Sequence, residues 1–94
     1  MYSYRPLREI VREIIGIKLQ KSLWRLDKHI DVLKEVGINI NEISLTAYFL
    51  GILRAIAYDV TLSIESRALT WREYKELAIG FVNIIRKEVK NALD

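Results

Sequence analysis

The single histidine of the chain, His29, is the first residue whose chemistry has to be considered. The chain contains no cysteine, so carboxylates alone would have to complete a metal site around this imidazole. The Glu-x-x-His spacing of metal sites in ferritin-like helical bundles is absent, because Leu26 stands three residues before His29. We therefore expect no metal and no cofactor, and we expect His29 to be a partly exposed residue on the edge of a helix.

Catalytic patterns are also missing from the sequence. It contains no identifiable Ser-His-Asp set, glycine-rich phosphate loop or paired-carboxylate motif. A helical enzyme that works by electrostatics needs several cations around one pocket, and the most apolar segment of the chain supplies only Arg54. We expect Arg54 to form an ion pair with an acid from another helix. The sequence thus predicts a protein that is not an enzyme, and a small helical-bundle enzyme is the third hypothesis.

Basic side chains recur at helical spacing and could follow a phosphate backbone. The chain has a formal net charge of +3, and Trp24 lies at the border of the first basic group. Asp27 and Asp31 fall in the same region and would repel phosphates, so a solvated face with ion pairs competes with this interpretation. Direct, low-specificity DNA or RNA binding is the second hypothesis. The candidate nucleic-acid-binding residues are Lys18, Lys21, Arg25, Lys28, Arg72, Lys75, Arg86 and Lys90.

An apolar strip near the N-terminus leads to the first hypothesis, a protein–protein interface. At about 100° per residue, the apolar residues that follow Pro6 share one side of a helix. A single isoleucine also interrupts the polar side of the last helix. The candidate partner-binding residues are Tyr2, Tyr4, Leu7, Ile10, Val11, Ile14 and Ile79. We expect Leu7→Asp together with Val11→Asp to abolish association and to leave helicity nearly intact.

The elements that would position these residues are three long antiparallel helices in one domain over residues 1–94. Together they predict a small all-α bundle. Pro6 suits the first position of a helix, and Gly37 suits the left-handed residue that ends one. Thr70 and Glu73 form a capping box at the start of the last helix. The expected helices cover residues 6–36, 42–66 and 71–92.

The apolar side of the first helix changes direction near Gly16. A straight helix cannot bury both sides in one core, so two explanations remain open. Either the helix is kinked or split near Gly16, or it is continuous and its first third packs on a second body. We favour the second body. The earlier apolar set is Leu7, Ile10, Val11, Ile14 and Ile15, and the later set is Leu19, Leu23, Leu26, Ile30 and Leu33.

The segment from Ile43 to Ile64 is apolar on nearly every side and must be covered by the rest of the chain or by a partner. In a bundle of three helices each helix has two neighbours, which leaves part of this segment exposed. A membrane span is disfavoured, because Arg54 and Asp59 would lie near the middle of the bilayer. Inserting each charged side chain there costs about 2.5 to 3.5 kcal/mol.

The expected setting follows from composition. The N-terminus lacks the apolar run of an export signal and there is no cysteine, so a cytoplasmic protein is expected. Many Ile, Glu, Lys and Arg residues are typical of a thermostable protein. The mild basicity favours a small accessory or adaptor subunit of a nucleic-acid-processing complex, for example a DNA polymerase in DNA replication, or else a homodimer. Its partner would be a protein or a second copy, with nucleic acid as the alternative and no membrane.

Overall fold

The computed structural model describes residues 6–94, and within them every regular element is a helix, which confirms the all-α class. The two predicted helices that follow Gly37 are confirmed to within one residue at each end. Tyr2 and Tyr4, two of the predicted partner-binding residues, lie outside the described part of the chain. The helices are α1 (Leu7–Leu23), α2 (Leu26–Glu35), α3 (Glu42–Glu65) and α4 (Trp71–Leu93).

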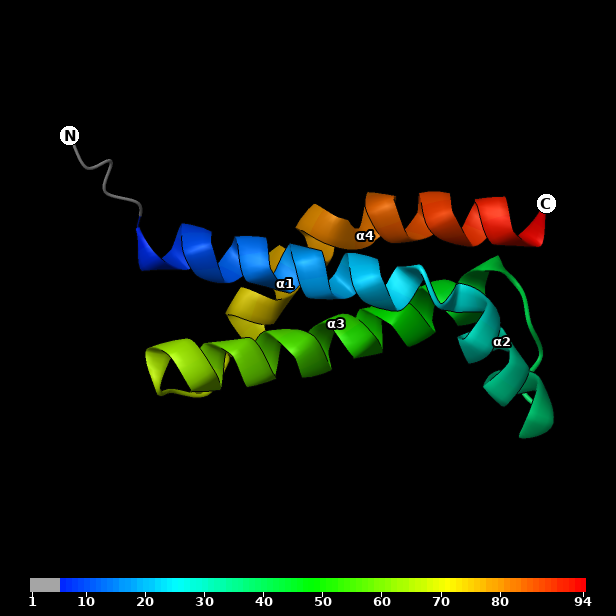
Figure 1. The fold of residues 1–94 in the computed structure, drawn as a ribbon, viewed down its shortest axis with the longest axis horizontal. Coiled ribbons are helices and arrows are strands. Elements are labelled where there is room, and N and C mark those ends of the chain that lie inside the picture. Colours follow the sequence, from blue (N-terminus) through cyan, green and yellow to red (C-terminus); the bar gives the residue numbers. More distant parts are fainter. Residues whose placement is uncertain (1–5) are drawn as a thin grey trace.

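The three long helices form an elongated bundle of 50 × 27 × 20 Å. α1 and α4 run in the same direction, and α3 runs antiparallel to both (Figure 1). The short helix α2 lies at the end of the bundle where α1 finishes and α3 begins (Figure 1). The prediction of three helices is therefore wrong in one respect, because the region predicted as one helix over residues 6–36 is α1 followed by α2.

The break in this region lies at Trp24 and Arg25, not near Gly16. Gly16 is inside α1, where a Cβ would make an ordinary van der Waals contact of 3.4 Å with the Phe81 ring of α4. Arg25 leaves the helical conformation with φ −105° and ψ 27°. Leu26, the residue after this break, packs into the end of the core.

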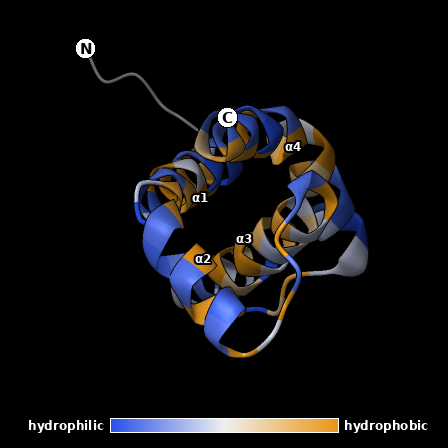
Figure 2. Ribbon diagram, turned by 90° about the vertical axis from the view of Figure 1, so that its right-hand side faces the viewer, coloured by the Kyte–Doolittle hydropathy of each residue, from blue (hydrophilic) through white to orange (hydrophobic). Residues whose placement is uncertain are grey.

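The core is built from the facing sides of α1, α3 and α4, with one residue from α2. Figure 2, which looks along the bundle, shows hydrophobic segments on the inner sides of the helices and hydrophilic segments outside. In α1 the buried positions follow one another every four residues, and each step moves the side chain about 40° around the axis. The buried line therefore winds around α1 and joins members of both predicted apolar sets. The buried core residues are Val11, Ile15, Leu19, Leu23, Leu26, Leu45, Phe49, Leu53, Ala57, Val60, Ile85 and Val89.

The central helix α3 remains partly uncovered, as its all-round apolar sequence predicts. Phe49 and Leu53 are fully buried, whereas Ile43, Tyr58 and Leu62 are exposed. Among the described helices, α3 is the one with the length and composition to cross a membrane, a test that the core helix of a soluble bundle also passes.

The prediction that Arg54 pairs with an acid from another helix is wrong. Its guanidinium lies over the ring of Trp71, with 4.2 Å between Arg54 Cζ and the ring centroid. A guanidinium above an indole face is a cation–π contact, and it attaches the side of α3 to the start of α4.

Candidate functional site

An apolar stripe follows the outer side of α1. Leu7, Ile10 and Ile17 expose 46%, 37% and 52% of their surfaces, and Ile14, which falls between them in the sequence, is half-buried. Their spacing of three, four and three residues places them on one side of the helix, as in the seam of a coiled coil. We call these four residues the outer stripe of α1.

Val11 does not belong to the outer stripe, so its prediction as a partner-binding residue is wrong. It is only 6% exposed and packs in the core, four residues before Ile15 on the inner side of α1. Because Val11 is buried, Leu7→Asp with Val11→Asp does not test the outer stripe by itself. A carboxylate at position 11 would be buried without a partner and would unfold the bundle as well as change its surface.

Ile79 is a separate exposed residue. It is 67% exposed on α4, and its neighbours one turn away along the helix are Lys75 and Asn83. The α4 residue that packs against α1 near Gly16 is Phe81, not Ile79. Ile79 therefore does not extend the outer stripe of α1.

The break between α1 and α2 forms a second surface feature, an open hollow of about 650 Å³. Trp24 stands at its edge with 70% of its surface exposed. The structure thus brings together Lys21 and Arg25 from the predicted basic stripe and adds an aromatic ring and an imidazole. We call this feature the α1–α2 corner, and it is lined by Lys21, Ser22, Trp24, Arg25 and His29.

His29 holds the two helices of this corner in place. Its Nδ1 lies 2.7 Å from the Tyr48 hydroxyl of α3, and its Nε2 lies 3.4 Å from the Ser22 hydroxyl of α1. The imidazole also contacts the rings of Tyr48 and Phe49 edge to face. His29 is half-buried, with each ring nitrogen facing a hydroxyl, and within residues 6–94 no group of three His, Asp or Glu residues is placed to hold a metal ion. The structure therefore gives His29 a positioning role in the fold.

The other predicted nucleic-acid-binding residues do not converge on the corner. Arg86 and Lys90 of α4 line a different hollow, beside the start of α3. The Nε of Arg72 lies 3.8 Å from an Oε of Glu76 on the same helix, an exposed ion pair. The remaining three residues are exposed and line neither hollow: Lys18, Lys28 and Lys75.

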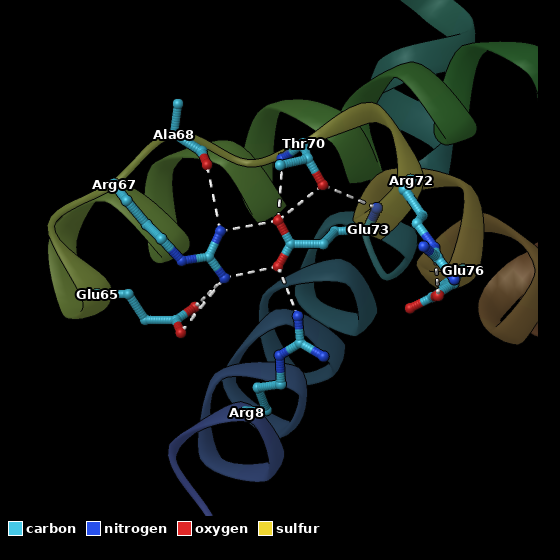
Figure 3. Close-up of polar contacts among 8 residues, drawn as sticks. All are labelled: Arg8, Glu65, Arg67, Ala68, Thr70, Arg72, Glu73 and Glu76. Carbon is cyan, nitrogen blue, oxygen red and sulfur yellow. Dashed lines mark hydrogen bonds and ion pairs between the residues drawn. The ribbon is translucent and has the colours of Figure 1, made fainter.

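The densest set of polar contacts lies where α3 turns into α4 (Figure 3). Arg67 donates two parallel hydrogen bonds to Glu73, with Nη1–Oε1 and Nη2–Oε2 distances of 2.8 and 2.6 Å. The predicted capping box is confirmed, since the Glu73 amide donates to the Thr70 hydroxyl and the Thr70 amide donates to the Glu73 carboxylate. Glu65 and Arg8 add contacts of 3.3 Å to this pair. Sequence reasoning found the cap and missed Arg67, because the turn that returns its side chain to Glu73 has no pattern of its own.

The electrostatics of this cluster fit a structural role. The bidentate hydrogen bonds from Arg67 hold the pKa of Glu73 well below its usual range, and the same contact raises the pKa of Arg67. A carboxyl group with a depressed pKa is ionised near neutral pH and is a poor proton donor. The adjoining hollow between α1 and α4 holds about 160 Å³ and mixes the arginines of α1 with Glu65, Glu73 and Glu76. Its cations are matched by acids, which is unlike a site that concentrates positive charge on a substrate.

Comparisons with protein-family models, curated proteins and solved structures find no match for this chain.

Proposed function

We propose that the protein is a non-enzymatic helical interaction module, and that the outer stripe of α1 is its docking surface. The observation that supports the proposal is that α1 carries two neighbouring lines of apolar side chains, of which one is buried and the other is exposed. Val11, Ile15 and Leu19 face the core, while Leu7, Ile10 and Ile17 expose apolar surface at coiled-coil spacing. The first line is required for folding. Polar side chains at the positions of the second line would serve the fold equally well. Burying the apolar side chains of this line against another helix would be favourable.

The occupant that we propose is a second copy, with the two α1 helices side by side and parallel. In a parallel pair, a residue on one flank of the stripe approaches the partner residue five positions further along the chain. Glu13 and Lys18 flank the outer stripe on opposite sides and have this spacing, so each pair would bring unlike charges together. An antiparallel pair would instead bring Glu13 near its own copy. Charge complementarity therefore favours the parallel arrangement.

The setting that we propose for this module is an assembly that processes nucleic acid, in which it acts as a small accessory or adaptor subunit of the kind attached to DNA polymerases. The support is the chain's excess of basic residues, with a formal net charge of +3. The basic side chains lie on the outer surfaces of α1, α2 and α4, where they leave the outer stripe free to bind a polypeptide.

Light scattering coupled to size-exclusion chromatography tests this proposal. We expect the mass to rise from one copy to two with concentration, and Ile10→Glu with Ile17→Glu to return it to one copy at unchanged helicity. The control is Ile43→Glu with Ile79→Glu, which changes two more exposed isoleucines outside the outer stripe and should leave the dimer intact. A strict monomer over the whole concentration range overturns the second-copy proposal. An equal loss of dimer in the control variant overturns it as well.

A further inference from the structure

We propose that the α1–α2 corner binds a short stretch of single-stranded nucleic acid, with one base stacked on Trp24 and neighbouring phosphates held by Lys21 and Arg25. The three side chains line one hollow of about 650 Å³, a size that accommodates a nucleotide and leaves it open to a continuing strand. This site begins at Lys21, one helical turn beyond Ile17 of the outer stripe, and it forms within a single copy of the chain.

The charges at the corner are available to a ligand. Within residues 6–94, neither Lys21 nor Arg25 takes part in an ion pair. Asp27 and Asp31, which argued against phosphate binding in the sequence, lie two residues on either side of His29. Two residues along a helix correspond to a rotation of about 160°, so both carboxylates lie on the side of α2 away from the imidazole that lines the hollow. The rotation along α2 thus directs these two acids away from the imidazole side of the hollow.

Trp24 makes a base the fitting ligand. Its indole is 70% exposed beside two cationic side chains, and Trp71, the other tryptophan, is covered on one face by Arg54. A free aromatic face next to cations stacks an unpaired base while the cations follow the backbone. The bases of a duplex are already stacked on one another and offer this ring no open face, which favours a single strand. His29 supports the geometry, because its contacts to Ser22 and Tyr48 fix the two helices that carry the site.

Fluorescence anisotropy with labelled oligonucleotides tests the site on the full chain. The probes are oligo(dT) and oligo(U) of about twelve nucleotides, together with a duplex of the same length, each measured at several salt concentrations. We expect binding of at least one single strand at low salt, with weaker binding of the duplex. The two single-stranded arms distinguish DNA from RNA, and preference for either supports the site.

Variants separate stacking from charge. Trp24→Ala should weaken single-strand binding by about fivefold or more and leave the salt dependence unchanged, while Trp24→Phe retains most of the affinity. Lys21→Gln with Arg25→Gln should lower the slope of log K against log salt by about 1.4, which is about 0.7 for each lost phosphate contact. The matched control, Lys34→Gln with Lys87→Gln, removes the same charge from exposed positions that do not line the hollow and should change affinity by about twofold or less. Far-ultraviolet circular dichroism checks that each variant is folded.

Three outcomes would overturn this inference. They are the absence of single-strand binding at low salt, tighter binding of the duplex than of either single strand, and a loss of affinity in the Lys34 and Lys87 control as large as that in the Lys21 and Arg25 variant. An unchanged affinity in folded Trp24→Ala would also remove the stacking role on which the choice of ligand depends.

Discussion

Arg67 Nη2 lies 2.6 Å from Glu73 Oε2, and this contact connects the end of α3 to the first turn of α4. Glu73 also completes the capping box with Thr70, so one carboxylate serves both the helix start and the turn before it. The cluster is more completely paired than the α1–α2 corner, and this difference separates a structural site from a candidate binding site in this molecule.

The Glu73 carboxylate should make the bundle sensitive to acid. Because its pKa is lower in the folded chain than in the unfolded chain, the contact contributes stability that is fully present above the ordinary glutamate pKa of about 4.5. That contribution is lost as the pH falls below this value toward the folded-state pKa. Glu73→Gln should therefore be less stable than the natural chain near neutral pH, with a difference that shrinks in acid. Urea unfolding between neutral pH and about pH 3 measures it, and a difference independent of pH would contradict this account.

The Thr70 hydroxyl should contribute through capping and through its own hydrogen bond to the Glu73 carboxylate. Thr70→Ala removes the oxygen that accepts from the Glu73 amide and donates to the Glu73 carboxylate, and it should destabilise the chain by about 1 kcal/mol near neutral pH. Thr70→Ser keeps the acceptor and is the matched control. Equal unfolding midpoints for the alanine and serine variants would rule out this role.

Replacing a glycine by alanine should change the stability according to the backbone conformation and the free space at that position. A Cβ at Gly51 meets nothing within 4 Å, so Gly51→Ala should stabilise α3 by about 1 kcal/mol through helix propensity. Gly37 has φ +83°, a backbone conformation that alanine adopts with strain, so Gly37→Ala should lower the free energy of unfolding by about 1 kcal/mol. Thermal unfolding of both variants provides the comparison. Destabilisation by Gly51→Ala would show that a close neighbour covers this side of α3 in solution.

Removing the hydroxyl of Thr46 should increase the stability of the bundle. Within the described residues its Oγ1 is buried and has no hydrogen-bond partner. Thr46→Val keeps the shape of the side chain and removes the unpaired polar atom, so it should stabilise the bundle by about 1 kcal/mol. Thr46→Ala, which leaves a small cavity, is the comparison and should not match that gain. A destabilised valine variant would mean that the hydroxyl is paired in solution.

The sequence predicts a helix boundary best where capping residues mark it. The Thr70–Glu73 box fixed the start of α4, and Asn41 with Ser44 caps α3 in the same way. The break at Trp24 and Arg25 has no proline or glycine to announce it. Arg25 departs from helical backbone angles at this point, and Leu26, the residue after it, packs in the core with residues distant in the sequence.

The candidate surfaces were predicted in part. Helical spacing placed Lys21 and Arg25 near each other, but only the break in the helix shows that they share a hollow with Trp24 and His29. Leu7 and Ile10 are exposed as the interface prediction requires, whereas Val11 is buried. Periodicity groups residues that share a side of a helix, and it does not say which side faces the other helices.

Disulfide trapping tests the proposed docking surface most directly, because the natural chain has no cysteine. Ile10→Cys and Ile17→Cys each place one thiol on the outer stripe of α1, and in the parallel pair each thiol meets its own copy. Under mild oxidation at low protein concentration, we predict rapid covalent dimers for both variants and none for Ile79→Cys on α4. Equal trapping at position 79, or no dimer at either stripe position, would contradict the account.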